Sequence, residues 1–236
     1  MCKECYIKNI KEKIRKKEAI IVAGVGSGAT AKAASRGGAD ILATYNTAVY
    51  RIYGIPTAMA FLPYDDCNEL ALNVAPQVVA NVKDVPVLLG IGAHDPRRNL
   101  SKLVEKAKDI GMAGVTNEPF IGMYEGDLRN QLEAAGLGFD REVELIRIAS
   151  EKGLMTLAYV FTPEEAVRMV EAGADFIGAM VGGVTSGGKA GGAATVSLDD
   201  AIDTIRSITE AISATGRFVP VLVHGGPLND VESVKI

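Results

Sequence analysis

The chain has 236 residues and a formal net charge of −4, with 48% hydrophobic and 23% charged residues. This length fits one large domain, and the composition does not change abruptly along the chain. Like charges do not gather into a block, which argues against a surface that binds nucleic acid or anionic membranes. The Lys- and Glu-rich segment from Met1 to Lys17 and the lack of a membrane-length apolar run predict a cytoplasmic protein without a membrane anchor.

The three cysteines do not predict a metal site. Cys2 and Cys5 form a single C-x-x-C pair, with no second pair and no nearby histidine to complete a tetrahedral zinc site. We therefore expect reduced thiols at a frayed N-terminus, and we expect Cys67 to be a small apolar helix residue.

After an N-terminal helical extension over residues 1–18, short apolar runs alternate with longer segments of helical period. Each run is nearly free of charge, as is typical of parallel strands that are buried on both faces. The alternation predicts a parallel sheet covered by helices, in one domain over residues 19–236. The seven predicted strands are Ala19 to Val25, Asp40 to Tyr45, Val85 to Leu89, Ala113 to Thr116, Met155 to Val160, Asp175 to Met180 and Phe218 to Val223.

Signals at the predicted helix ends support this interpretation. Thr162-Pro163-Glu164-Glu165 combines an N-cap hydroxyl, a proline at the first helical position and a glutamate three residues after the cap. Ser197 precedes Asp199 and Asp200 in a similar way. Gly37-Gly38-Ala39-Asp40 and Ala172-Gly173-Ala174-Asp175 repeat one helix-stop and strand-start formula, which favours a barrel of similar units.

The predicted fold class is therefore α/β, a TIM (β/α)8-type barrel that lacks the eighth βα unit. Only Pro227 to Ile236 follow the seventh predicted strand, which is too short for another helix and strand. We expect either a C-terminally incomplete chain or an open sheet edge that another subunit covers, and we therefore predict a homo-oligomer.

In such a barrel the ligand site is built from the loops that follow the C-terminal ends of the strands. Both histidines of the chain, His94 and His224, fall there, and a histidine can serve as acid, base, metal ligand or oxyanion donor. Asn117 and Glu118 follow the fourth strand and complete the set of catalytic candidates. Asp95 follows the third strand, and with Glu118 it forms a candidate Mg²⁺ site. A structural alternative stays open for each histidine, which can cap a helix or bond a loop carbonyl.

Two long segments, Asn46 to Asp66 and Gly182 to Val196, follow the second and sixth strands and are typical of lids or binding loops. The first contains several aromatic residues and the second is rich in glycine. The alternative is that they are insertions without a function. We predict that both fold over the same mouth.

The segment Gly24 to Ala29 matches the G-x-G-x-x-A fingerprint of dinucleotide-binding folds. Such a fold needs an acidic residue at the end of the second strand, but that strand ends in Tyr45-Asn46, and Asp40 lies at its other end. We therefore disfavour a dinucleotide. The glycines still allow backbone amides to approach a phosphate or carboxylate.

Taken together, these segments resemble the phosphoenolpyruvate hydrolase-like TIM-barrel family, which is similar to indole-glycerol-phosphate synthase barrels and also forms the C-terminal domain of plant viral-resistance and ATP-binding-like proteins. The resemblance covers nearly the whole chain. Its carriers are Gly26-Ser27-Gly28, Gly37-Gly38-Ala39-Asp40, Tyr45-Asn46 with Tyr50-Arg51, Leu62-Pro63-Tyr64-Asp65-Asp66, Asp95-Pro96, Gly114-Val115-Thr116-Asn117-Glu118-Pro119, Gly138-Phe139-Asp140-Arg141-Glu142-Val143-Glu144, Tyr159-Val160-Phe161 and His224-Gly225-Gly226-Pro227.

The resemblance implies a barrel and suggests phosphoenolpyruvate or phosphonopyruvate as the substrate class. The resemblance does not identify which residues are catalytic. We expect a hydrolase or lyase that binds a small anionic metabolite, a phosphorylated or carboxylated acid, in which Arg51 and Lys189 neutralise the anion and His224 or His94 moves a proton. The alternative is a ligand-sensing or protein-interaction domain without turnover. The candidate substrate-binding residues are Gly26, Ser27, Asn46, Arg51, Tyr64, Tyr159, Thr185, Ser186, Lys189, Gly225 and Gly226.

Overall fold

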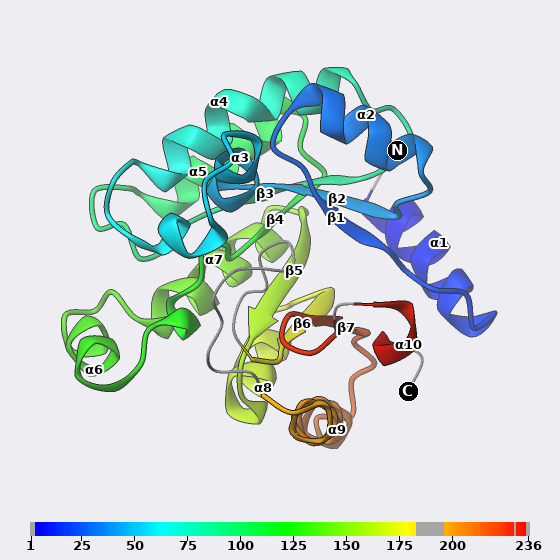
Figure 1. Cartoon of the computed structure of the whole chain (residues 1–236), viewed down its shortest axis with the longest axis vertical. Helices are drawn as coiled ribbons and strands as arrows, with labels where there is room; N and C mark the ends of the chain where they lie inside the picture. Colours follow the sequence, from blue (N-terminus) through cyan, green and yellow to red (C-terminus); the bar gives the residue numbers. More distant parts are fainter. Residues whose placement is uncertain (1–2, 183–195, 229, 235–236) are drawn as a thin grey trace.

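The computed structural model describes residues 3–182, 196–228 and 230–234. Seven parallel strands form one curled sheet in the order of the sequence (Figure 1). The strands are β1 (Val22–Gly24), β2 (Ile41–Thr44), β3 (Val87–Gly90), β4 (Gly114–Thr116), β5 (Met155–Val160), β6 (Phe176–Met180) and β7 (Val221–His224). This is the predicted TIM-type barrel without one βα unit, and in the described part of the chain β1 and β7 are its two open edges.

The longer helices from α2 to α9 cover the outside of the curled sheet, and the remaining helices lie at its two ends (Figure 1). The helices of the described residues are α1 (Lys3–Arg15), α2 (Gly28–Arg36), α3 (Asn46–Ile52), α4 (Cys67–Ala80), α5 (Leu100–Ile110), α6 (Gly126–Ala134), α7 (Phe139–Glu151), α8 (Pro163–Glu171), α9 (Leu198–Ala214) and α10 (Val231–Val234), with the 3-10 helices η1 (Thr57–Phe61) and η2 (Ile121–Met123). In the described ranges, no helix combines the length and the apolar character that crossing a membrane requires.

The pleat of the strands divides their side chains between two apolar layers. On β5, Met155 and Leu157 point into the barrel with Ile41 of β2, whereas Ala158 and Val160 pack outward against the helices. All of these residues are buried, which explains why the predicted runs are almost free of charge. Each predicted run overlaps one observed strand.

Helix α1, within the predicted N-terminal extension, closes the end of the barrel at which the strands begin. Its Ile10 is 4% exposed and packs with the barrel interior. Lys13 and Lys3 bind Asp40 and Asp175, at N···O distances of 2.6 and 2.9 Å. These aspartates come from the repeated helix-stop formula and directly precede β2 and β6. The expectation of a frayed N-terminus is therefore wrong from Lys3 onward, while Cys2 lies outside the described residues.

The segment from Asn46 to Asp66 is not a structureless loop, which corrects the prediction. It contains α3 and η1, and residues 46–50 of α3 are all buried. Tertiary packing against α4 stabilises a helix that has no side-chain cap and little helical period. Most of the second predicted loop, residues 183–195, lies outside the described residues, so the prediction of a shared mouth stays open.

Candidate functional site

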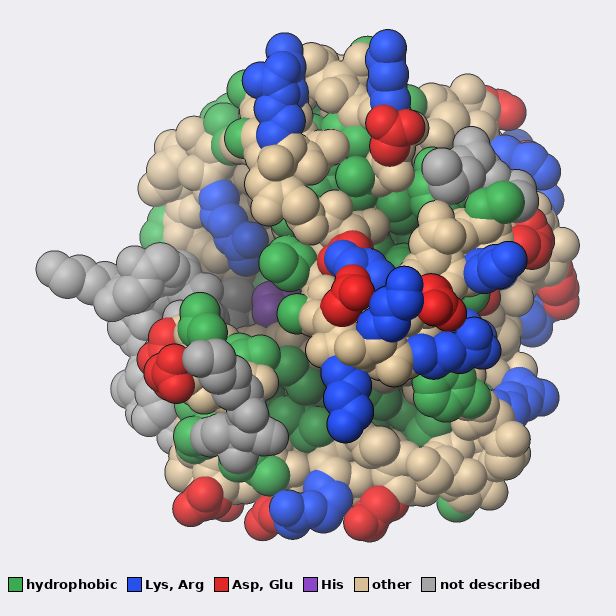
Figure 2. Space-filling model, turned by 90° about the vertical axis from the view of Figure 1, so that its right-hand side faces the viewer, with side chains coloured by type: hydrophobic (Ala, Val, Ile, Leu, Met, Phe, Trp, Pro, Cys, Tyr) green, Lys and Arg blue, Asp and Glu red, His purple; other side chains and the backbone are tan. Residues whose placement is uncertain are grey.

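A cavity of about 400 Å³ lies along the gap between β1 and β7. Its apolar wall comes from the two edge strands, and its polar groups are Tyr45, Arg51, Tyr159 and His224. We call it the mouth cavity, because these four residues lie at the end of the sheet where the strands finish. On the face that carries α1 and α10, Figure 2 shows a hollow with a histidine side chain in it and apolar side chains beside it.

The two tyrosines of the mouth cavity are held by the strands around them. Tyr45 directly follows β2 and is 3% exposed, and Tyr159 belongs to β5 and is 6% exposed. Glycines in neighbouring strands leave room for their rings: a Cβ on Gly24 would lie 2.0 Å from the Tyr45 hydroxyl oxygen, and one on Gly178 would lie 2.5 Å from Tyr159 Cδ1. Any larger residue at these two positions would displace the rings.

Glu118 is a buried carboxyl group beside this cavity, with an exposed fraction of 3%. Its Oε2 atom has no hydrogen-bond partner among the described residues. Burial raises the pKa of Glu118 to about 7, although the charge of Arg51 and a hydrogen bond from Thr47 act in the opposite direction. A carboxyl group with this pKa is able to take up or release a proton near neutral pH.

Arg51 and His224 are the cationic and imidazole groups of the mouth cavity. Arg51 is exposed, and its Nε donates to Thr57 Oγ1 at 3.1 Å, which fixes the guanidinium above the strand ends. Burial and the Arg51 charge lower the pKa of His224, so its imidazole is neutral at pH 7. His224 Nδ1 is buried without a partner in the described residues, and its ring centroid lies 5.4 Å from that of Tyr159.

Asn117 connects the strand ends rather than facing the cavity. Its Oδ1 accepts from the Tyr159 N–H at 2.7 Å, and its Nδ2 donates to the Tyr159 carbonyl at 3.0 Å and to Glu142. Glu142 also accepts from the Ile121 N–H. Asn117 was predicted as catalytic, but these contacts occupy its amide and make it part of the support of Tyr159. Glu142 was not predicted, although it stands on the buried face of α7 between Phe139 and Leu145, where an acidic residue is unusual.

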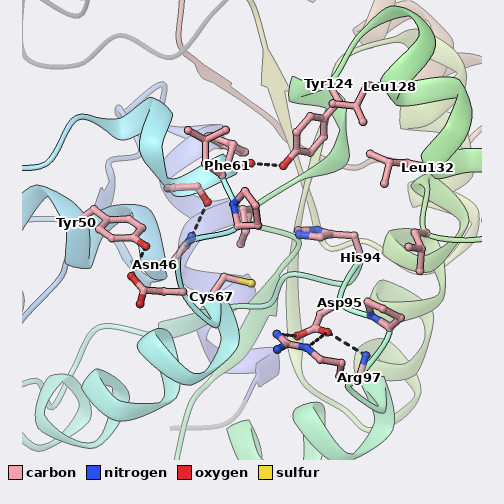
Figure 3. Close-up of a pocket in the computed structure, with 17 residues that line it drawn as sticks. Asn46, Tyr50, Phe61, Cys67, His94, Asp95, Arg97, Tyr124, Leu128 and Leu132 are labelled. Carbon is pink, nitrogen blue, oxygen red and sulfur yellow. Dashed lines mark hydrogen bonds and ion pairs between the residues drawn. The ribbon is translucent and has the colours of Figure 1, made fainter.

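His94 lies apart from this group. It lines a second cavity together with Asn46, Cys67, Asp95 and Arg97, which Figure 3 shows. The structure therefore places the predicted residues His94, Asn117, Tyr159 and His224 at one end of the sheet, as expected, but it separates the two histidines between two cavities.

The residues present do not fit a magnesium ion. Arg97 occupies both carboxylate oxygens of Asp95, at 2.9 and 2.8 Å, whereas Glu118 faces Arg51 and Thr47. Among the described residues no group of three or more His, Cys, Asp or Glu side chains is arranged to hold a metal ion. The pairing of Asp95 with Glu118 remains a prediction that these contacts do not support.

Several predicted substrate-binding residues have structural roles. Ser27 caps α2 in a reciprocal capping box with Thr30, and a Cβ on Gly26 would lie 2.1 Å from the Ala48 carbonyl oxygen. Gly225 and Gly226 adopt positive φ angles in the turn after β7. Tyr64 is 66% exposed and lines neither cavity. Thr185, Ser186 and Lys189 lie outside the described residues.

An open barrel of parallel strands, with a cation, a carboxyl group and an imidazole at the strand ends, is typical of small-molecule-binding TIM-type proteins. The sequence profile of the phosphoenolpyruvate hydrolase-like family matches residues 6–236, and the chain belongs to this family.

Two curated relatives come from Solanum lycopersicum. The ToMV resistance protein Tm-1(GCR237) is 38% identical over 229 residues, and the ToMV susceptible protein tm-1(GCR26) is 38% identical over 226 residues. Each alignment covers 96% of this chain and 30% of the relative, so the chain spans less than a third of the length of these relatives.

Solved structures with a similar fold have low sequence identity. Oxaloacetate acetylhydrolase in complex with the inhibitor 3,3-difluorooxalacetate has a TM-score of 0.61 at 15% identity, over 98% of this chain and 76% of that chain. Phosphonopyruvate hydrolase in complex with oxalate and Mg²⁺ has a TM-score of 0.59 at 15% identity, over 96% of this chain and 81% of that chain. At this identity the likeness shows a shared fold and nothing more.

Proposed function

We propose that this protein is an enzyme, a hydrolase or lyase, that acts on a small carboxylated or phosphorylated acid at the mouth cavity. The observation that carries the proposal is the pair of exposed Arg51 and neutral His224 on the lining of one cavity at the strand ends, with the buried carboxyl group of Glu118 close enough for the Arg51 charge to act on its pKa. The family to which the chain belongs supports the same substrate class, and the solved structures of similar fold include enzymes that were studied with oxalate and an oxalacetate analogue.

In this proposal, Arg51 binds an anionic group of the substrate through the guanidinium N–H groups that Thr57 leaves available. Glu118 exchanges a proton with the substrate, because its pKa lies near neutrality. The imidazole of His224, which lines the cavity, hydrogen-bonds a substrate oxygen. Burial keeps the phenol groups of Tyr45 and Tyr159 protonated, since it raises the pKa of both, and they can act as donors. No step depends on magnesium.

The role of Arg51 can be tested by oxalate binding, because oxalate is a small dianion that needs no turnover to be detected. We expect Arg51→Gln to weaken oxalate binding about tenfold or more, the scale for losing a charged hydrogen-bond donor. Arg36→Gln is the matched control, since Arg36 is an exposed arginine on α2 outside the cavity lining, and it should bind as the wild type does. Equal affinities in all three proteins would contradict an anion site at Arg51.

A second candidate is a ligand-binding barrel without turnover, which the near-complete burial of Glu118 favours. Phosphate release from phosphoenolpyruvate and phosphonopyruvate, measured with and without Mg²⁺, separates the two candidates. We expect turnover by the wild type and a rate at least about a hundredfold lower for Glu118→Gln, the loss typical of removing a general acid or base. Tight oxalate binding without turnover of any tested acid would favour the non-catalytic candidate.

A further inference from the structure

The second cavity has the size and lining of a small-molecule site in its own right. Its volume is about 490 Å³, within the range of about 300 to 1,000 Å³ that is usual for ligand pockets. Apolar side chains form most of its wall, among them Phe61 of η1, Tyr124 and Leu132. Figure 3 shows Leu128 and Leu132 on one side, Asn46 and Cys67 on the other, and the His94 imidazole pointing into the space between them.

An aromatic partition separates this cavity from the mouth cavity. Phe120 is 2% exposed, and its ring centroid lies 5.5 Å from that of Phe61, which lines the second cavity. The same ring lies 5.5 Å from Tyr159, which lines the mouth cavity. The adjacent residues Tyr45 and Asn46 likewise line different cavities. The second cavity is therefore not an extension of the proposed substrate site.

The charged groups of the second cavity already have partners. The Tyr50 hydroxyl donates to Asp65 at 2.6 Å, and Arg97 forms a two-point contact with Asp95. The lining thus carries two carboxylates and one guanidinium, an arrangement that does not favour an anionic ligand. His94 differs from these groups, because its Nδ1 is buried and has no hydrogen-bond partner within the described residues. Burial lowers the pKa of His94, so its ring is neutral at pH 7.

We propose that the second cavity binds an uncharged aromatic or branched apolar molecule through a hydroxyl group that hydrogen-bonds the imidazole of His94 where the ring faces the cavity. The apolar wall accommodates the body of such a molecule, and the absence of a free charge on the wall selects against ions. A hydroxyl both donates and accepts, so it matches either tautomer of the neutral imidazole.

The probe for this proposal is 2-naphthol, whose fluorescence is easily followed because the chain has no tryptophan. Titration into the full chain should give saturable binding. His94→Phe keeps an aromatic ring of similar size but removes the nitrogen, and it should weaken 2-naphthol binding about threefold to tenfold, the effect of one lost neutral hydrogen bond. 2-Methoxynaphthalene cannot donate a hydrogen bond, and its weaker binding should respond less to His94→Phe. The anion 2-naphthoate should bind less well than 2-naphthol.

Two exposed apolar residues, one inside and one outside the second cavity, test whether the apolar wall of that cavity binds the probe. Leu128 lines the cavity and is 53% exposed, whereas Ile52 is 47% exposed and lines neither cavity. Leu128→Gln should weaken 2-naphthol binding several-fold, and Ile52→Gln should leave it unchanged. Saturating oxalate should not displace 2-naphthol, whether or not oxalate binds at the mouth cavity. The proposal is wrong if 2-naphthol does not bind saturably, if His94→Phe and Leu128→Gln both bind it as the wild type does, or if oxalate displaces it.

Discussion

At the scale of single residues, two buried glutamates differ in what their carboxyl groups contact. Glu118 leaves one oxygen without a partner in the described residues, while both oxygens of Glu142 accept N–H groups, from Asn117 and Ile121. Burial raises the pKa of both groups, to about 7 and about 8 respectively. The same residue type therefore keeps an unpaired acceptor oxygen at one position and forms a structural connection at the other, and the two should respond differently to substitution.

The raised pKa of Glu118 predicts a loss of stability as the pH rises. The folded protein holds this proton more tightly than the unfolded chain, whose pKa is near 4.5. The stabilisation is therefore complete below pH 4.5 and is lost as the pH rises through about 7. Glu118→Gln mimics the protonated form, so its free energy of unfolding should exceed that of the wild type by about 1 kcal/mol at pH 5 and by about 3 kcal/mol at pH 8.

Urea unfolding at pH 5 and pH 8 measures this difference. Glu210→Gln, on the exposed side of α9, is the control and should follow the wild type at both pH values. If Glu118→Gln and the wild type lose the same free energy of unfolding between pH 5 and pH 8, the carboxyl group is already ionised in the folded protein and has no proton to exchange at neutrality.

Glu142→Gln should destabilise the fold where Glu118→Gln does not. A glutamine offers one acceptor and one N–H₂ group, so it cannot accept from both Asn117 and Ile121. The buried donor that loses its partner should lower the free energy of unfolding by about 1–3 kcal/mol at pH 5, where Glu142, whose pKa is about 8, is neutral like the glutamine. Urea unfolding measures this change, and a variant as stable as the wild type would show that these two hydrogen bonds do not hold α7 to the segment that follows β4.

The sequence predicted the location of a site residue well when a strand positions that residue, and poorly when a loop or a helix does. Asn117, Tyr159 and His224 lie at the strand ends as predicted, because strand direction alone decides that. His94 comes four residues after β3 ends, so the strand pleat no longer determines which way it points, and it entered the other cavity. Glu142 reaches the site from a covering helix, which strand positions do not reveal.

At the scale of elements, buried charge-free runs predicted all seven strands, since both faces of a parallel sheet are covered. The predicted ends differ from the observed ones by a few residues, as at Ala19 against Val22, because hydrogen bonding to a neighbour and not composition sets where a strand begins. Helix α3 was not predicted, because its first five residues are buried on every side of the helix and therefore show no helical period.

Helix α1 should be required for the stability of the barrel. Ile10→Ala should lower the free energy of unfolding by about 2–4 kcal/mol, since it leaves a cavity where the side chain closes the barrel interior. Lys8→Ala, at an exposed position of the same helix, should change it by less than about 0.5 kcal/mol. Chemical denaturation measures the free energy of unfolding of both variants. An Ile10→Ala protein of wild-type stability would mean that α1 is not packed on the barrel in solution.

At the scale of the whole molecule, the sheet is curled but not closed in the described residues, because β1 and β7 each pair with one neighbour only. Ile21 beside β1 and Val223 of β7 expose 52% and 38% of their surfaces along this gap. Open edges with apolar side chains are sites where other strands can pair. The mouth cavity lies in the same gap, so whatever covers these edges also shapes the proposed substrate site.

Hydrogen exchange should reveal the state of these edges. Alternate N–H groups of a parallel strand face opposite neighbours, so part of the N–H groups of β1 and β7 face the gap. In a dilute, monomeric sample the amides of Val22 and Val223, which alternate with the amides that pair with β2 and β6, should exchange at least about tenfold faster than that of Leu157 in the middle of the sheet. If the protein is a homo-oligomer that covers the gap, raising the protein concentration should slow exchange in β1 and β7 and leave β5 unchanged. Exchange in the edge strands that is slow at every concentration would mean that the edges are closed within one chain, and the prediction of an oligomer built on them would fail.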